Sequence, residues 1–311
     1  MLVKEFKFDS ATGVCTVSGA SYAPDDGVVN AVVVMHHGMA EHSERYRSFF
    51  EYLTSNKVAV YMHDMANHGK SNQNPDLTGY FGETDGYKAL IKDFKTVYDY
   101  AKREYPEKKI IICGHSMGSF IARCFVAQFA DESFAGAIFI GTGGSNSAAG
   151  VGRACADIVA KARGSIYKSK FIDKLTFGSY GNQTEKRTAF DWLTKDNEIV
   201  DKYIADDKCG FLFSVAGMRD LVDLNIASNS SQWYEKVRKD LPIFLIAGEK
   251  DPVGAYGKGI NEINDRLAAS GHTKVTMKLY ENDRHEILNE NDKDVVYSDI
   301  LNWINTEVLG D

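Results

Sequence analysis

The architecture of this chain follows from one stretch, KIIICGHSMGSF at residues 109–120. A short apolar run ends at Gly114, Ser116 follows two residues later, and Gly118 leads into a segment typical of a helix. This is a G-x-S-x-G motif between a buried strand and a helix, the setting that a nucleophile elbow requires. Glycines flank the serine because the turn is too tight for side chains. We expect Ser116 Oγ to stand clear of the sheet at a helix N-terminus, where negative charge is stabilised.

Apolar runs of strand length alternate with helical patterns on both sides of this stretch. The strand-like runs cover residues 31–36, 58–62, 136–140, 241–248 and 274–280, and the helical patterns cover residues 44–55, 86–105, 256–269 and a final segment that carries Val296, Ile300 and Trp303. Residues 2–8 and 13–20 alternate in polarity around a turn and predict an N-terminal hairpin. Strands that alternate with helices indicate the α/β class, with a mostly parallel sheet flanked by helices.

The alternation stops after the strand at 136–140. From there to about residue 225 the sequence is typical of short helices and loops, without a strong strand. We therefore expect a core formed by residues 1–142 and 226–311, with residues 143–225 inserted as a helical cap.

Composition narrows the function classes. The chain has 311 residues, a net charge of −7 and 25% charged residues, and this balance argues against nucleic acid as a partner because phosphate binding needs a basic face. No segment has the length of an uncharged transmembrane span, and the first residues lack the apolar core of a secretory signal. Five widely spaced cysteines suit free thiols in a reducing compartment, and no pair has metal-site spacing. We expect a cytoplasmic protein without a bound metal.

A serine hydroxyl needs a base to activate it and a carboxylate to orient that base. In elbow enzymes these groups follow in the order serine, acid, histidine, each after a late strand. Asp251 follows the run that ends at Gly248, and His285 follows the run that ends at Tyr280. We predict the triad Ser116, Asp251 and His285. Asp283 and Glu249 are substitute acids that we expect to face water.

The other histidines fit the role of base less well. His115 lies on the elbow and should point away from Ser116 Oγ, and His272 precedes the last strand, at the wrong edge of the sheet. The remaining candidates precede the serine; they are His36, His37, His63 and His68.

Attack on a carbonyl develops an oxyanion that needs two hydrogen-bond donors. We expect one donor to be the backbone N–H of Met117. The second should come from the loop after the strand at 31–36, where Gly38 allows close approach and the N–H of Met39 is the candidate. Gly38 and Met39 should also line the substrate pocket.

Four segments carry a resemblance to a known superfamily. They are HGMAEHSERY (37–46), which is similar to H-G-x-x-E-H-S-x-R-Y, the elbow GHSMG (114–118), DMANHGKS (64–71) and FDWLTKD (190–196). The chain resembles α/β hydrolases, and among them the monoglyceride lipase and lysophospholipase-like serine hydrolases of the bacterial cytosolic type. The resemblance implies an α/β-hydrolase fold with a cap, and hydrolysis of monoacylglycerol- or lysophospholipid-like esters through an acyl-enzyme without a cofactor.

One residue departs from that pattern, since Asn67 stands where glycine is usual. Asparagine is the residue after glycine that best adopts a positive φ, so we expect the loop to persist. We interpret His68 and Ser71 in the same loop as structural groups that satisfy backbone atoms.

The first part of the cap is basic and apolar. Residues 151–177 hold six basic and two acidic residues, whereas residues 178–208 hold five basic and seven acidic ones. The basic part suits transient contact with an anionic lipid surface. Because several acidic residues follow immediately, we favour the simpler explanation that these charges are the solvated faces of ordinary cap helices.

Several functions remain open at this stage. A thioesterase, a prolyl-type aminopeptidase and a carbon–carbon bond hydrolase use the same triad, and a non-catalytic binding protein can retain the scaffold. The serine at position 116 excludes members that use an aspartate nucleophile. Acyl length, headgroup and oligomeric state are left open by the sequence.

Overall fold

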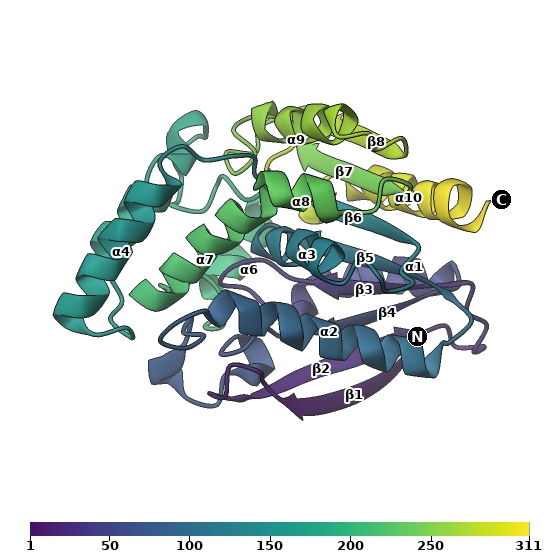
Figure 1. The fold of residues 1–311 in the computed structure, drawn as a ribbon, viewed down its shortest axis with the longest axis horizontal. Coiled ribbons are helices and arrows are strands. Elements are labelled where there is room, and N and C mark those ends of the chain that lie inside the picture. Colours follow the sequence, from purple (N-terminus) through teal and green to yellow (C-terminus); the bar gives the residue numbers. More distant parts are fainter. Residues whose placement is uncertain (311) are drawn as a thin grey trace.

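The computed structural model describes residues 1–310, and its centre is an eight-stranded sheet (Figure 1). The strands are β1 (Leu2–Asp9), β2 (Thr16–Ala23), β3 (Ala31–His36), β4 (Val58–His63), β5 (Lys109–His115), β6 (Gly136–Ile140), β7 (Ile243–Gly248) and β8 (Val275–Tyr280). Their order across the sheet is β1-β2-β4-β3-β5-β6-β7-β8. Strands β3 to β8 run parallel, whereas β1 and β2 pair antiparallel at one edge. The predicted α/β class with a mostly parallel sheet is confirmed.

Helices cover both faces of the sheet (Figure 1). They are α1 (Arg47–Ser55), α2 (Gly86–Glu104), α3 (Met117–Gln128), α8 (Ser231–Lys236), α9 (Lys258–Ala269) and α10 (Lys293–Trp303). Alternate residues of one strand serve opposite faces, as the period of a strand requires. Ile110 and Ile112 of β5 join the apolar layer with α2 and α3, whereas Ile111 and Cys113 join the layer with α1 and α10. Burial on both faces explains why the central strands read as unbroken apolar runs.

Short helical segments complete the chain. The 3₁₀ helices cover Ser43–Tyr46, Gly69–Ser71, Pro75–Leu77, Tyr180–Gln183 and Ile287–Asn289, and a π-helical turn covers Ile304–Leu309.

The N-terminal hairpin differs from the prediction at its second strand. That strand begins at Thr16, three residues later than the polarity pattern indicated. The preceding segment instead forms a loop fixed to α2, because Asp93 accepts hydrogen bonds from Ser10 Oγ (2.5 Å) and from the N–H of Ala11 (2.7 Å). In this segment, hydrogen bonds to the side chain of Asp93 therefore take the place of the predicted strand pairing.

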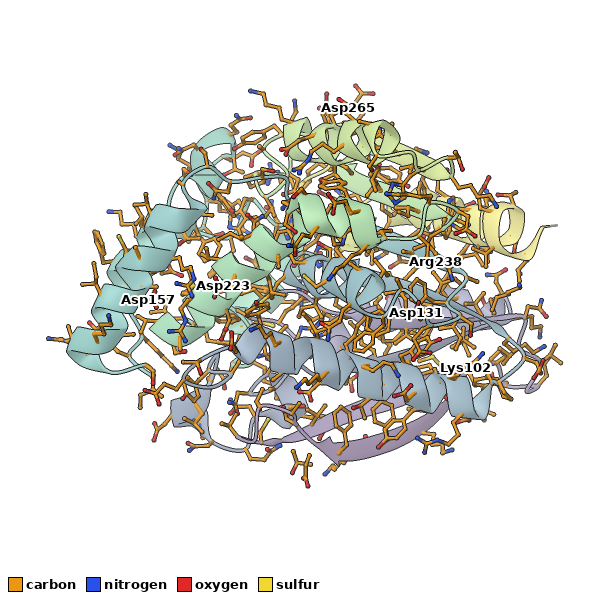
Figure 2. All side chains as sticks on the ribbon, in the orientation of Figure 1. Lys102, Asp131, Asp157, Asp223, Arg238 and Asp265 are labelled. Carbon is orange, nitrogen blue, oxygen red and sulfur yellow. The ribbon has the colours of Figure 1, made fainter. Side chains whose placement is uncertain are left out.

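The segment between β6 and β7 is helical. It contains α4 (Ala149–Arg163), α5 (Lys170–Phe177), α6 (Asn197–Ala205) and α7 (Val215–Ser228). Figure 1 shows α4 at the end of the molecule farthest from the sheet, with α7 between α4 and the core. Two ion pairs join these helices: Arg153 of α4 contacts Asp223 of α7, and Arg219 of α7 contacts Asp157 of α4. Figure 2 labels the two carboxylates, Asp157 and Asp223. We propose that residues 143–225 form a cap over the carboxyl ends of the strands. Within residues 1–310, no helix has the length and apolar character needed to cross a membrane.

Candidate active site

Ser116 lies at the sharp turn from β5 into α3. Its backbone has φ 54° and ψ −123°, a conformation that costs a non-glycine residue about 1–3 kcal/mol. The flanking glycines explain how the turn fits: a Cβ on Gly114 would lie 2.2 Å from the carbonyl oxygen of Gly118. A Cβ on Gly118 would lie 2.4 Å from the carbonyl oxygens of His36 and His37, so only glycine lets α3 approach the end of β3 this closely.

Asp251 and His285 meet behind the elbow. Asp251 follows β7 and His285 follows β8, and parallel strands bring their carboxyl ends to the same edge of the sheet. His285 Nδ1 lies 2.9 Å from Asp251 Oδ2, and both side chains are almost fully buried. Asp251 Oδ1 also accepts the N–H of Val253 at 2.8 Å, which fixes the carboxylate. The contact between Nδ1 and Oδ2 orients the imidazole, whose Nε2 makes no hydrogen bond within residues 1–310.

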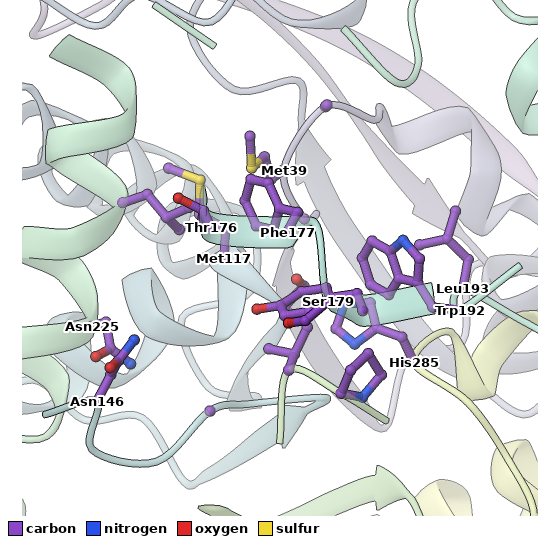
Figure 3. A pocket seen from close by; sticks show the side chains of 18 of the residues that line it. Met39, Met117, Asn146, Thr176, Phe177, Ser179, Trp192, Leu193, Asn225 and His285 are labelled. Atoms are coloured by element: carbon purple, nitrogen blue, oxygen red, sulfur yellow. The ribbon is translucent and has the colours of Figure 1, made fainter. Parts of the chain in front are cut away.

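A cavity of about 880 Å³ lies over the elbow, within the size range of small-ligand pockets. Ser116 and His285 both line it, whereas Asp251 lies behind His285. Figure 3 shows Trp192 and Leu193 beside His285, Met39 and Phe177 above the elbow, and Asn146 with Asn225 at the far end. The cavity is thus apolar near the centre and polar at one end.

The two backbone N–H groups expected to hold an oxyanion are available. Met39 and Met117 both line the cavity, and neither N–H donates a hydrogen bond to any group within residues 1–310. Gly38 packs directly on the elbow, since a Cβ added there would lie 3.0 Å from Ser116 Cβ. The loop after β3 and the start of α3 therefore border the same space around Ser116.

A buried polar cluster lies beneath this loop, and the sequence-based reasoning missed it. Glu41 Oε1 accepts the N–H of Gly38 (2.6 Å) and the hydroxyl of Tyr46 (2.7 Å), and Tyr46 also contacts His115 Nδ1 (2.8 Å). Burial opposes the charge of Glu41, but the hydrogen bond to His115 and the charge of Arg45 hold its pKa well below the usual value. The same contact with Glu41 outweighs burial at His115 and raises the pKa of that imidazole. As expected, His115 is engaged away from Ser116 Oγ.

Arg45 joins this cluster to the loop that carries His285. Its guanidinium donates to Glu41 at 2.6 Å and makes two parallel bonds to Glu286, at 2.7 and 2.6 Å. The planar fork of arginine suits such a two-point contact with a carboxylate. The ring of Tyr203 on α6 lies 4.8 Å from the guanidinium carbon, so the cap closes over the cluster. The i, i+4 spacing of Glu41 and Arg45 in HGMAEHSERY is the sequence signal that could have revealed it.

Asp283 corrects one prediction. We expected this carboxylate to face water, but it is fully buried and forms an ion pair with Lys195 at 2.5 Å. Lys195 belongs to residues 190–196, which run along the loop of His285. The other substitute acid, Glu249, stays half exposed at the surface, as expected.

The other histidines are structural. His36, His37, His63 and His68 are buried together beneath the loop after β3, and burial lowers the pKa of each. His68 Nδ1 bonds to the carbonyl of Ala66, and Ser71 Oγ links the N–H of Ser18 to the carbonyl of Asp64, as their structural interpretation requires. His272 is buried near the end of α9, remote from the cavity lining.

Asn67 adopts the conformation that the sequence predicted for it. Its φ is 56°, and its side-chain amide donates to the carbonyl of Tyr80 at 2.6 Å. The loop therefore keeps its path without glycine.

Within residues 1–310, one group of side chains has the spacing of metal ligands: His42, Asp206 and Cys209. His42 Nε2 lies 2.8 Å from Asp206 Oδ2, and burial raises the pKa of the Cys209 thiol. We interpret the contact as a polar tie between α6 and the loop after β3.

The chain is similar in sequence and in fold to known lipases and esterases. The chain is 27% identical over 275 residues to a monoacylglycerol lipase of Mycolicibacterium smegmatis, covering 88% of this chain and 87% of that protein. A monoglyceride lipase of Rattus norvegicus is 24% identical over 92% of this chain and 85% of its own length. A carboxyl esterase of Bacillus coagulans, solved in complex with glycerol, superposes with a TM-score of 0.92 at 28% identity over 99% of both chains.

A family model described as "Serine aminopeptidase, S33" matches residues 27–292, which include the elbow, the cap and the loops of Asp251 and His285. With this match, the eight-stranded sheet and the lipase and esterase relatives, the chain belongs to the S33 serine aminopeptidase family of α/β hydrolases and resembles monoglyceride lipase.

Proposed function

We propose that the protein is a serine carboxylic-ester hydrolase that works through an acyl-enzyme. The observation that carries this proposal is the buried Asp251–His285 pair, with His285 and Ser116 on the wall of one cavity. In the proposed first step Ser116 Oγ attacks the ester carbon while its proton passes to His285 Nε2. The tetrahedral intermediate then releases the alcohol, which takes that proton. Water, deprotonated by His285, next attacks the acyl-enzyme and frees the acid and the serine.

We propose that the N–H groups of Met39 and Met117 donate hydrogen bonds to the oxyanion of each tetrahedral intermediate and so stabilise its negative charge. Donors without a partner in the resting protein need no rearrangement when the oxyanion forms, and each such donor typically contributes about 10²–10³ in kcat. Glu41 supports the first donor indirectly, because it fixes the neighbouring peptide through the N–H of Gly38.

The proposed substrates are monoacylglycerol-like or lysophospholipid-like esters. The apolar side chains above the elbow, among them Met39 and Phe177, suit an acyl chain, and the polar end at Asn146 and Asn225 suits a hydroxylated or charged alcohol. The lipase relatives support this choice. The same groups can also attack thioesters and amides. Amides are included because the matching family is described as a serine aminopeptidase family.

We further propose that α4 and α5 contact an anionic lipid surface. Val151 and Ile158 of α4 are each 67% exposed, and Phe171 and Leu175 of α5 are 69% and 59% exposed. Val151 and Ile158 are seven residues apart and Phe171 and Leu175 are four apart, so each pair lies on one side of its helix. Basic side chains without a carboxylate partner within residues 1–310 accompany them: Lys161, Arg163, Lys168, Lys170 and Lys174. An apolar face bordered by free cations is typical of helices that lie on membranes.

The cytoplasmic location inferred from the free cysteines is likewise a proposal. All five are free thiols in the structure.

The first test is hydrolysis of p-nitrophenyl esters of increasing acyl length, beside Ser116→Ala and with a fluorophosphonate probe read by mass spectrometry. We expect the wild type to hydrolyse the esters and to carry one label, on Ser116. The alanine variant should lose at least about 10³-fold in kcat and take no label.

Two outcomes would contradict the proposal. A wild type that neither hydrolyses an ester nor takes the probe would favour a binding protein on this scaffold. An alanine variant as active as the wild type would remove Ser116 as the nucleophile. Thioester and peptide substrates in the same assay decide between the acyl classes.

A further inference from the structure

We propose that Trp192, a cap residue, is a positioning residue that holds the imidazole of His285 in place for catalysis. The proposal rests on the function proposed above for His285. Trp192 lies in residues 190–196, which we call the strap, between the 3₁₀ helix at Tyr180–Gln183 and α6.

The indole of Trp192 packs against the imidazole. The two ring centroids are 5.2 Å apart, with 41° between the ring planes, and Figure 3 shows the rings side by side at the edge of the cavity. The ring of His115 lies 4.7 Å from His285, and Gly141 leaves so little space that a Cβ there would lie 3.1 Å from His285 Cε1. Of these neighbours, Trp192 alone comes from the cap.

Tyr180 in turn supports the indole. Its ring meets Trp192 edge-on, with centroids 5.0 Å apart and 76° between the planes. The ring of Tyr180 therefore restrains the indole of Trp192 in its contact with His285.

The strap also bonds to the backbone of the histidine loop. The N–H of His285 donates to the carbonyl of Trp192 at 3.4 Å, and the N–H of Glu286 donates to the carbonyl of Leu193 at 2.7 Å. Two side-chain contacts flank this pair: Lys195 with Asp283 at 2.5 Å, and Arg284 with the carbonyl of Asp191 at 2.6 Å. These contacts tie the loop after β8 to the cap, although His285 itself belongs to the core.

The proposed chemistry explains why such support matters. When Ser116 attacks, His285 becomes a cation and must keep Nε2 aligned first with Oγ and then with the departing alcohol. An aromatic face beside it favours the cation and limits rotation of the ring. A misplacement of about 1 Å at a reacting group can cost about 10²-fold in rate.

A lining role for the acyl chain is the competing explanation, because Trp192 also borders the cavity. The two roles separate in kinetics. A lining residue changes KM more strongly as the acyl chain lengthens, whereas a residue that aligns the base lowers kcat by a similar factor for every ester.

The test compares Trp192→Leu with Trp192→Phe on acetyl, butyryl and octanoyl p-nitrophenyl esters. We expect Trp192→Leu to lower kcat by about 10- to 100-fold for all three esters, with KM within about threefold. Trp192→Phe should recover most of the rate because it restores an aromatic face. The matched control is Trp303→Leu, a buried tryptophan of α10 that stacks on Phe244 and is remote from the cavity lining. This control should lose stability but keep kcat.

A second measurement requires no turnover. In the Ser116→Ala background, the proton shared by His285 Nδ1 and Asp251 should give a downfield signal in proton NMR. We expect this signal with Trp192 or Phe at that position, and its loss by exchange broadening in Trp192→Leu. An unchanged signal in the leucine variant, a kcat within about threefold of wild type, or a loss that grows with acyl length would each overturn the proposal. If no ester is hydrolysed and the signal still depends on residue 192, the positioning role stands and the proposed ester hydrolysis fails.

Discussion

Ser116 adopts a backbone conformation that other residues avoid, and its neighbours show why the chain accepts this. The glycines at 114 and 118 remove the two side chains that would collide with backbone carbonyls, and the N–H of Ser116 bonds to the carbonyl of Ile140 at 2.9 Å. The rest of the structure therefore determines the conformation of Ser116, as strained functional residues require. This strain lowers stability, but it places the Ser116 side chain on the wall of the cavity at the start of α3.

The contribution of the buried cluster to stability can be tested at Arg45, because Arg47, two residues away, provides a matched control at the surface. Replacing Arg45 with leucine would leave Glu286 buried without its ion-pair partner and Glu41 with His115 alone, and such a loss typically costs about 3–5 kcal/mol. Arg47 pairs with Glu51 at the surface, where both side chains are more than half exposed, so Arg47→Leu should change stability by less than about 1 kcal/mol. Urea unfolding of the two variants measures the difference. Equal losses would mean that the buried cluster contributes no more than a surface pair.

Local sequence patterns predicted where the candidate site residues lie in the fold, but they did not predict the side-chain contacts around those residues. Ser116, Asp251 and His285 each follow a recognisable strand, so topology alone brought them to one edge of the sheet. The contact of Arg45 with Glu286 joins residues 241 positions apart, and no periodicity encodes such a pairing. Asp283 was misjudged for the same reason, since its partner Lys195 belongs to the cap. The roles assigned to the triad and to the oxyanion donors stay predictions until the kinetic tests are made.

At the scale of elements, the strap and the two outer helices of the cap differ in what they touch. The strap contacts the histidine loop through both backbone and side chains. In contrast, α4 and α5 contact α7, through Arg153 with Asp223 and through the paired backbone segments around Lys168 and Ser214. Their exposed apolar side chains face outward. In the proposed cap, the strap therefore contacts the histidine loop, whereas α4 and α5 pack on α7.

The outer helices lead to a prediction about membranes. We expect hydrolysis of a lipid ester in anionic vesicles to fall steeply as salt rises, because each exposed lysine near such a surface contributes about 1 kcal/mol of screened attraction. A double variant, Ile158→Ser with Phe171→Ser, should bind the vesicles several-fold more weakly and keep its rate on a soluble acetyl ester.

Val295→Ser is the matched control for that measurement, since Val295 is 52% exposed on α10, outside the cap. It should bind vesicles like the wild type. If hydrolysis in anionic vesicles does not change with salt, the basic residues of α4 and α5 belong to ordinary solvated helix faces and do not contact the lipid.

The whole molecule carries a pH dependence set by its buried histidines. Burial lowers the pKa of His36 to about 3 and also lowers the pKa of His37, His63 and His68. The unfolded chain then binds more protons than the folded one below the ordinary histidine value of about 6.5. Each of these groups removes about 1.4 kcal/mol of stability per pH unit as the pH falls from 6.5 toward its folded pKa.

Buried carboxyls act in the opposite direction, among them Asp93 and Asp220. Burial raises the pKa of Asp93 to about 6 and of Asp220 to about 7, so the folded state binds their protons first and gains stability on acidification. Because the four histidines outnumber Asp93 and Asp220, we expect the free energy of unfolding to fall between pH 6.5 and 5. Urea titrations at pH 8.0, 6.5 and 5.0 measure this slope. Stability that is constant or rises on acidification would contradict it.

The way in which α4 and α5 are attached has a consequence for divergence among related enzymes. Because α4 packs mainly on α7, residues 149–163 can accumulate substitutions without disturbing the groups proposed to react. The helix α5 is more constrained, since its Phe177 meets the ring of Tyr180, which supports Trp192. Residues 149–163 nonetheless border the cavity, through Ala149. This segment is therefore an exchangeable cassette: transplanted between relatives, it should transfer preference for one ester over another while the chemical step is inherited unchanged from the recipient.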